Sequence, residues 1–292
     1  MPELPEVETV RVGIAGVLEG ARVTDVTIAD PRLVRPFDPE LVAAELRGER
    51  VEGVERRGKY LIVRFESGRV LLIHLRMTGS FRVAASGSLA DDPHRRAVLR
   101  LDNGSDVAYR DVRRFGTWEL LEPGDLAPYL ARRLGPEPLG RLSSQRLGDR
   151  LRGRRTSLKA ALLDQRTVAG LGNIYVDEAL WYARLAPLRR AESLDSDELK
   201  RLHRAIRRAL RLGIERQGAS LRDYAQPDGE SGGMQHEFRV YGREGEPCDR
   251  CGTPVAKTRV AGRGTHYCPR CQHSPEQVAL DVAAASDDGT DP

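Results

Sequence analysis

The chain has 292 residues, 40% of them hydrophobic and 5% aromatic, and a formal net charge of +4 at pH 7. This length is enough for two domains, each with its own hydrophobic core. No apolar run approaches the roughly 20 residues that cross a bilayer, and three of the first eight residues are acidic, unlike a secretory signal. We therefore expect a cytoplasmic protein without a membrane partner.

The charges are unevenly distributed along the chain. Residues 274–292 contain five acids and no Lys or Arg, so the rest of the chain is more basic than the total indicates. A basic body with an acidic tail rich in small residues is typical of a polyanion-binding protein with a disordered end. A basic surface that is merely solvated is the alternative. Only four of the 47 basic residues are lysines, among them Lys59, and lysine, unlike arginine, is able to transfer a proton.

The first half of the sequence combines one helix with many short strands. Apolar residues recur at helical spacing from Pro5 to Leu18, with acidic residues in the first turn, which predicts an amphipathic helix. The runs 22–29, 60–66, 69–75, 97–102 and 117–121 are rich in strand-forming residues, and Ser67-Gly68 and Asn103-Gly104 have the composition of hairpin turns. Short strands at this spacing predict a β-sandwich or barrel.

The second half is predicted to be helical. Residues 122–155 are rich in Pro, Gly and Arg, which predicts a connection between domains. Helices are predicted over 157–165, 173–185 and about 196–217, the last with leucine and isoleucine on one face and arginine on the other. Segment 219–235 has many glycines and polar residues and predicts a mobile loop.

The four cysteines form the pattern Cys248-x2-Cys251-x16-Cys268-x2-Cys271, which is the spacing of a four-thiolate zinc site. Two disulfides are the alternative, but paired Cys-x-x-Cys motifs in a cytoplasmic chain favour zinc. Because thiolates fill all four positions, the zinc is predicted to be structural. The sequence between the pairs predicts a hairpin with Arg263 at its tip, where the side chain is suited to contact a phosphate or a DNA groove.

Two further motifs point to an anion and to a nucleophile. The turn Gly170-Leu171-Gly172-Asn173 leaves backbone N–H groups at the start of the following helix, where an anion binds, although Asn173 as a plain N-cap is the alternative.

Pro2 and Glu3 likewise have a simple interpretation as a helix start. If Met1 is removed, however, Pro2 becomes a secondary amine that is unprotonated at neutral pH far more often than a lysine, and it can attack a sugar carbon. Glu3 would then protonate the opened sugar.

Together these segments resemble bacterial formamidopyrimidine-DNA glycosylase, also called 8-oxoguanine DNA glycosylase/AP lyase, over residues 2–272. The motifs that carry the resemblance are residues 2–9 (PELPEVET), 57–60 (RGKY), 74–80 (HLRMTGS), 113–116 (RRFG), 134–138 (LGPEP), 164–165 (DQ), 170–175 (GLGNIY) and the finger over 241–272. Two positions depart from the family pattern. Val112 stands where a proline is expected, and residues 94–97 lack the second histidine common there.

The resemblance implies an α+β fold, with an N-terminal β-sandwich with flanking helices, then a helix-two-turn-helix domain with a C-terminal zinc finger. The implied segments are a catalytic domain over residues 1–121, a connection over 122–155, a helix-two-turn-helix domain with a lesion-contacting loop over 156–235, the zinc finger over 236–273 and a disordered acidic tail over 274–292.

The resemblance also implies roles for individual residues. Pro2 corresponds to the Schiff-base nucleophile, Glu3 to the acid that opens the deoxyribose, Lys59 to the proton donor of β-elimination, and Arg263 to the residue tied to δ-elimination. The residues that correspond to DNA contacts, or to side chains that fill the gap left by a flipped-out nucleotide, are His94, Arg113, Arg154, Asn173, Met77 and Phe115. Taken singly, residues such as Met77 and Phe115 are more often core residues, and one such as His94 is more often a surface histidine.

The implied reaction is removal of 8-oxoguanine opposite cytosine, and of ring-opened purines, from damaged double-stranded DNA, followed by β- and δ-elimination. We expect one structural Zn²⁺, no nucleotide cofactor and a monomer. Two alternatives remain, an endonuclease VIII-type glycosylase for oxidised pyrimidines and a non-catalytic binder of damaged DNA. Loop 219–235 and the pair Arg113 and Phe115 favour the purine enzyme, and the intact catalytic candidates argue against a mere binder.

Overall fold

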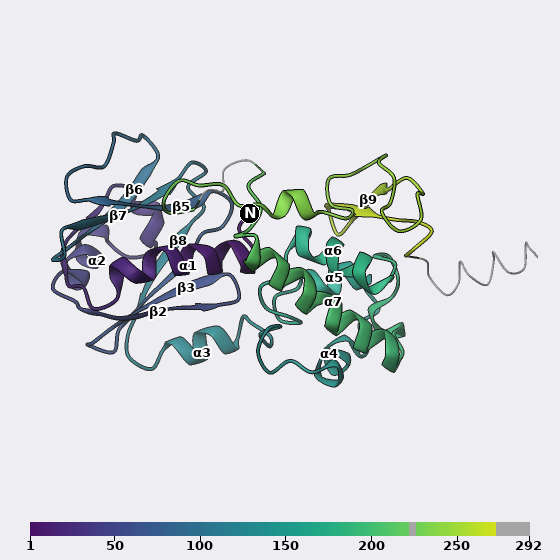
Figure 1. Cartoon of the computed structure of the whole chain (residues 1–292). Coiled ribbons are helices and arrows are strands. Elements are labelled where there is room, and N and C mark those ends of the chain that lie inside the picture. Colours follow the sequence, from purple (N-terminus) through teal and green to yellow (C-terminus); the bar gives the residue numbers. More distant parts are fainter. Residues whose placement is uncertain (222–225, 273–292) are drawn as a thin grey trace, which may run out of the picture. The chain divides into compact units, whose positions relative to one another are not determined.

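The computed structural model describes residues 1–221 and 226–272 and contains two compact units (Figure 1). One consists of residues 1–135 with 211–237, and the other of residues 136–210 with the chain from 238 onward. Segment 211–237, grouped with the helical domain in the sequence analysis, thus packs with the N-terminal unit. The predicted acidic tail over 274–292 and residues 222–225 of the predicted mobile loop lie outside the described residues. Within the described part, no helix is long and apolar enough to span a membrane.

The N-terminal unit begins with helix α1 (Leu4–Leu18), as the apolar periodicity predicts. Val7, Val10 and Ile14 are fully buried in the main core. Glu3 is the N-cap, and a carboxylate oxygen of Glu6 accepts a hydrogen bond from the Glu3 backbone N–H at 2.9 Å. This contact satisfies one of the amide groups that a helix start leaves without an intrahelical partner.

Two four-stranded antiparallel sheets form the predicted β-sandwich. One sheet has the order β1 (Val23–Ile28), β6 (Arg95–Leu101), β7 (Ser105–Asp111) and β5 (Gly79–Ala85); the other has β2 (Val51–Arg57), β3 (Tyr60–Phe65), β4 (Val70–His74) and β8 (Thr117–Leu121). Both sheets contribute to one core, in which Phe81 and Tyr109 of the first meet Trp118 of the second. The turns at residues 67–68 and 103–104 join β3 to β4 and β6 to β7, as predicted.

Within residues 31–151, four short helical segments lie outside the helices predicted from the sequence pattern. The turn η1 (Pro31–Val34) and helix α2 (Pro39–Leu46) follow β1. Helix α3 (Leu126–Ala131) lies in the predicted connection, where Leu126 and Leu130 pack with Ile62 and Leu72 of the second sheet. The predicted connection is therefore partly helical, and it also contains α4 (Ser144–Leu151).

The second unit contains the predicted helices and hairpin. The predicted elements are the helices α5 (Leu158–Leu163), α6 (Asn173–Ala183) and α7 (Ser196–Glu215), whose last residues belong to the N-terminal unit, and the hairpin strands β9 (Ala256–Val260) and β10 (Arg263–Tyr267). Two short turns were not predicted: η2 (Ala191–Ser193) lies in this unit, and η3 (Met234–Glu237) lies in the N-terminal unit. The N-cap of α6 is Gly172, and Asn173 is the first helical residue. The interpretation of Asn173 as an N-cap is therefore wrong.

Candidate active site and metal centre

Pro2 and Glu3 are buried at the start of α1, with Met1 before them. Glu3 is only 2% exposed. The Glu6 carboxylate accepts hydrogen bonds from the backbone N–H groups of Glu3 and Ala219, each at 2.9 Å. Glu6 therefore links Ala219 to the N-terminal residues that include Pro2.

Lys59 lies in the tight turn between β2 and β3 and is 5% exposed. Gly58, beside it, has a φ of 60°, a left-handed conformation that costs glycine little. Arg56 fixes this turn to α1, since its guanidinium donates to the Glu8 carboxylate at 2.9 Å and to the Gly58 carbonyl at 3.1 Å. One ion pair therefore fixes the turn that carries Lys59 to the helix that follows Pro2.

His74 ends β4 opposite Tyr60 in the register of the sheet. Burial, together with the positive charges of Arg76 and Lys59, lowers the pKa of His74 from 6.5 to about 3. The Nδ1 atom accepts a hydrogen bond from the Arg76 N–H at 3.0 Å, which a neutral ring allows. His74 is therefore a neutral acceptor between Lys59 and the turn that carries Met77.

We predict that His74 makes the protein acid-sensitive. The unfolded state binds the proton near pH 6.5 and the folded state only near pH 3, so this contribution is complete above pH 6.5 and is lost as the pH falls. The free energy of unfolding should drop by roughly 2–3 kcal/mol between pH 6.5 and 4.5. His74→Asn, which retains an acceptor, should lose this slope in urea unfolding, and His203→Asn should retain it. Identical slopes in all three proteins would contradict the prediction.

A second cluster gathers the candidate gap-filling residues around Asp111. The carboxylate of Asp111 accepts from the Thr78 hydroxyl and, at 2.7 Å, from the Gly116 N–H. The Thr78 oxygen in turn accepts from the Arg113 N–H at 2.9 Å. The turn containing Met77 and the loop containing Arg113 and Phe115 are thereby held together. The Phe115 ring is 53% exposed and lies 4.8 Å from the guanidinium of Arg113.

Tyr109 explains the glycines of these two loops. A Cβ at Gly79 would lie 2.3 Å from the Tyr109 hydroxyl oxygen, and one at Gly116 would lie 1.8 Å from it. Any side chain at either position would overlap this fully buried ring. The glycines of the HLRMTGS and RRFG motifs are thus packing requirements of the core beneath the loops.

His94 joins the Asp111 cluster through its backbone. Its carbonyl accepts from the Asp111 N–H at 3.0 Å, and its N–H donates to Asp92 at 2.8 Å. The ring lies near Arg96, with 3.4 Å between Nδ1 and Nη2. The structure therefore places His94 beside the loop of Arg113, although no described contact assigns it to DNA.

Within the N-terminal unit, segment 226–229 packs against strand β5 and helix α1. The guanidinium of Arg82 donates to the Gln226 carbonyl, and the Val83 N–H donates to the Pro227 carbonyl at 3.4 Å. A Cβ at Gly13 of α1 would lie 2.8 Å from Cγ of Pro227, whereas a Cβ at Gly16 would meet nothing within 4 Å. Helix α1 thus approaches this segment closely at Gly13.

Because the surroundings of Gly13 and Gly16 differ, substitution by alanine is expected to have opposite effects on the free energy of unfolding at the two positions. Gly16→Ala should raise the free energy of unfolding by up to about 1 kcal/mol, because alanine favours the helix over glycine. Gly13→Ala has the same helical advantage but must displace Pro227, and overpacking costs about 1–3 kcal/mol. Urea unfolding of the two variants should therefore rank Gly13→Ala as the less stable. Equal stabilisation of both would show that Pro227 moves away freely.

In the second unit, α5 and α6 hold the hairpin that carries Arg263. The Gly264 carbonyl accepts from Lys159 Nζ and from the Asn173 side-chain amide, each at 3.0 Å. Asp177 forms a fully buried ion pair with Lys159 at 2.7 Å and accepts from the His266 N–H at 3.0 Å. Arg263 itself is exposed at the start of β10. The side chain of Asn173 therefore helps to position the hairpin.

Arg154 is half-buried, and its charge is partly neutralised within the second unit. Its guanidinium lies 3.0 Å from the Asp164 carboxylate and donates to the Arg150 carbonyl at 3.0 Å. A phosphate contact at Arg154 would have to share the guanidinium with Asp164.

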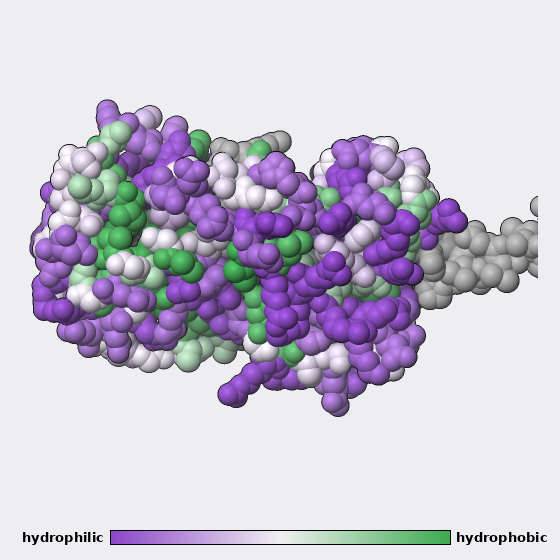
Figure 2. Space-filling model, viewed as in Figure 1, coloured by the Kyte–Doolittle hydropathy of each residue, from purple (hydrophilic) through white to green (hydrophobic). Residues whose placement is uncertain are grey.

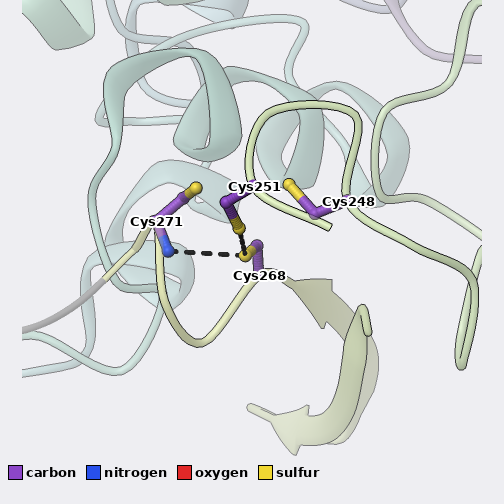
Figure 3. Close-up of side chains that lie close together, drawn as sticks. All are labelled: Cys248, Cys251, Cys268 and Cys271. Atoms are coloured by element: carbon purple, nitrogen blue, oxygen red, sulfur yellow. Dashed lines mark hydrogen bonds between the residues drawn. The ribbon is translucent and has the colours of Figure 1, made fainter. Parts of the chain in front are cut away.

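The four cysteines converge on one point, as the spacing predicts (Figure 3). Their sulfur atoms all lie within 4.8 Å of one another. Trp181 of α6 packs against this centre, donates to Cys248 Sγ at 3.4 Å, and carries the Arg250 guanidinium 3.9 Å from its ring centroid. The set of four sulfur donors fits tetrahedral Zn²⁺ and leaves no position for water or substrate. It is a structural zinc site that fixes the finger to α6.

Sequence reasoning did not find the residues that hold these candidates in place. Thr78 lies inside a quoted motif, but nothing in the sequence indicates its hydrogen bond to Asp111, 33 residues away. Glu178 is also missed. It is fully buried in α6, and its carboxylate accepts from three successive backbone N–H groups at the start of the finger, those of residues 239–241.

Three family models match the chain in order. They are the formamidopyrimidine-DNA glycosylase N-terminal domain over residues 1–118, the formamidopyrimidine-DNA glycosylase H2TH domain over 134–225, and the zinc finger found in FPG and IleRS over 245–273. With the sandwich and the zinc site, they define a DNA glycosylase of the helix-two-turn-helix, zinc-finger class.

Curated relatives and solved structures specify the family. The chain is 50% identical to formamidopyrimidine-DNA glycosylase of Symbiobacterium thermophilum, covering 96% of this chain and 92% of that protein, and 48% identical to that of Geobacillus kaustophilus, covering 93% and 100%. It therefore belongs to the formamidopyrimidine-DNA glycosylase family. Similar structures include a Lactococcus lactis FPG variant with Fapy-dG DNA (TM-score 0.87) and MutM with carbocyclic 8-oxo-G DNA (TM-score 0.86), each 39% identical and covering 94% of this chain and 100% of that one.

Proposed function

We propose that this chain excises oxidised purines from duplex DNA and cleaves the resulting abasic site, with Pro2 as nucleophile. The observation that carries the proposal is the burial of Glu3 directly beside Pro2. Arg56 in addition links the β2–β3 turn that carries Lys59 to helix α1, which follows Pro2. A buried acid next to an amine is the pair that attack on a sugar and protonation of its ring oxygen require.

The proposed reaction begins with attack on the sugar and ends with elimination of the two flanking phosphates. Once Met1 is removed, the unprotonated nitrogen of Pro2 bonds to C1′ of the deoxyribose. The glycosidic bond breaks as the base leaves with its electron pair and takes up the proton that the Pro2 nitrogen releases. Glu3 protonates the ring oxygen as the sugar opens to an iminium. Loss of a C2′ proton then expels the 3′ phosphate, and loss of a C4′ proton expels the 5′ phosphate. Water hydrolyses the remaining iminium, which releases the sugar fragment and regenerates the Pro2 amine. We assign proton transfer in β-elimination to Lys59 and the phosphate contact in δ-elimination to Arg263.

The residues around Asp111 support a base-flipping step. Phe115 presents an exposed aromatic face beside Arg113, and Met77 lies on the turn fixed to the same loop. We propose that these three side chains fill the gap left by the extruded nucleotide, since unstacked neighbouring bases need an apolar or planar partner. We propose His94, Arg154 and Asn173 as backbone contacts, and the resemblance supports these assignments.

The substrate class is decided by comparing two duplexes. Borohydride trapping and base release should be faster with 8-oxoguanine opposite cytosine than with thymine glycol. The opposite order would favour the endonuclease VIII-type alternative, and one solved relative is described as a Lactococcus lactis FPG complex with an oxidised pyrimidine. Release of neither base, with tight binding to both duplexes, would favour a non-catalytic binder. We also propose that the chain acts as a monomer, which light scattering of the active protein checks. We further propose that it requires no nucleotide cofactor.

A further inference from the structure

Four arginines form a stripe along the outer face of α7. This arginine stripe consists of Arg201, Arg204, Arg208 and Arg211, all of them exposed. At about 100° and 1.5 Å per residue, they lie within roughly 80° of arc and span about 15 Å, opposite the buried apolar face of the helix. In Figure 2, strongly hydrophilic residues gather over the position of α7 in Figure 1.

Among the described residues, no ion pair neutralises the C-terminal part of this stripe; Glu215, one turn beyond Arg211 on the same face, ends the helix without an ion pair to it. The sequence contains no Asp or Glu from Lys200 to Gly213. Asp197 pairs with Lys200, and Glu198 pairs with Arg189 and lies 3.7 Å from Arg201. Across the described residues, the other three arginines of the stripe form no ion pair. Because like charges three and four residues apart repel on a helix, the stripe weakens α7 in isolation and favours an external anion.

The stripe is partly pre-ordered for such an anion. The guanidinium of Arg208 lies 4.4 Å from the ring centroid of Tyr182, and Arg204 Nε donates to the Lys200 carbonyl at 3.3 Å. Both side chains keep further N–H groups for a ligand. A guanidinium held in this way loses less conformational freedom when it binds a phosphate through two parallel hydrogen bonds.

We propose that the arginine stripe binds the phosphate backbone of a second DNA duplex while the protein is engaged with a lesion. A straight row of cations is complementary to duplex DNA, which presents about one negative charge per 1.7 Å of its axis. None of the candidate DNA contacts lies on α7. Such a contact is independent of sequence, depends on salt, and lets the protein pass between neighbouring DNA segments. The inference rests on the proposed function only in requiring a first, lesion-bound duplex.

The test fills the first site covalently. The protein is trapped with borohydride on a short 8-oxoguanine duplex, and binding of a fluorescent undamaged duplex to the purified adduct is titrated at several salt concentrations. The triple variant Arg204→Gln, Arg208→Gln, Arg211→Gln should bind the second duplex at least about tenfold more weakly, with a salt slope smaller by about 2–3. Its trapping rate on the lesion duplex should be unchanged.

A matched control removes the same charge elsewhere. Arg47, Arg50 and Arg100 are exposed and ion-paired, Arg47 and Arg100 with Asp25 and Arg50 with Glu66. Their triple substitution by Gln should leave binding of the second duplex close to that of the unsubstituted protein. Equal losses in both triple variants would overturn the proposal, because net charge alone would then explain the binding.

Three further results would also overturn it. The first is an adduct that binds no second duplex, and the second is a stripe variant that traps the lesion duplex more slowly. The third is binding that appears only after residues 274–292 are removed, which would assign the stripe to the chain's own acidic segment. If no adduct forms at all, the Schiff base of the proposed function is wrong instead. The stripe is then tested with the protein saturated by a tetrahydrofuran abasic-analogue duplex.

Discussion

A glycine inserted between Met1 and Pro2 is expected to abolish both borohydride trapping and strand cleavage. Removal of Met1 frees the Pro2 nitrogen in the unsubstituted protein, whereas the inserted glycine keeps this nitrogen in an amide, which has no nucleophilic lone pair. The fold and the zinc content should remain unchanged. Pro2→Gly should behave differently, because it keeps an N-terminal amine that is primary and more flexible. Its trapping should weaken without disappearing. Mass spectrometry of the reduced adduct locates the attachment, and an adduct on Lys59 in place of Pro2 would overturn the assignment.

Glu3→Gln serves as the companion to this experiment, since it removes the acid and leaves the amine intact. Base excision should fall strongly, because the ring oxygen of an intact nucleotide must be protonated as the sugar opens. Cleavage of a preformed abasic site, part of which is already ring-opened, should fall less. Equal losses on both substrates would instead indicate that Glu3 acts by holding the start of α1, where it is the N-cap.

The elements that depend on residues close together in the sequence were predicted correctly. Helix α1 follows from its apolar spacing, and the β3–β4 turn from Ser67-Gly68. Strands β2, β5 and β7 were not individually delimited within the β-rich region, because their sequences interleave charged residues or begin with glycine. In β7 the buried Asp106 and Asp111 obscure the apolar alternation, and these carboxylates bind loops on either side of the strand.

In the candidate site, too, features set by neighbouring residues were predictable, whereas features set by distant residues were not. The metal centre was predictable because its four ligands fall in two short motifs, and the hairpin between them is fixed by its own turn at Ala261 and Gly262. The buried pair of Lys159 and Asp177 was not predicted, since its partners at the hairpin lie about a hundred residues away in the chain. A charge in an amphipathic helix suggests a solvated face, and only the tertiary fold shows it to be buried.

The variant Cys268→Ser tests the structural role of the zinc site. Cys268 is fully buried and packs with Trp181 and Val240 as well as facing the metal. Zinc binding by such four-ligand sites contributes about 10–16 kcal/mol, comparable with the whole stability of a domain of about 5–15 kcal/mol. Loss of one thiolate should therefore release the metal and unfold the finger.

Unfolding of the finger should remove DNA binding as well, because the Gly264 carbonyl and the His266 N–H would lose their partners on α5 and α6, and Arg263 would no longer be held out on a hairpin. Arg263→Gln is the matched control. It removes the charge at the hairpin tip while the four sulfur ligands stay, so the protein should retain zinc and bind DNA more weakly without losing the finger. Metal analysis, proteolysis of the finger and duplex titration of the two variants distinguish these outcomes. A Cys268→Ser protein that lacks zinc yet nicks abasic DNA at the normal rate would show that the finger contributes nothing to the reaction.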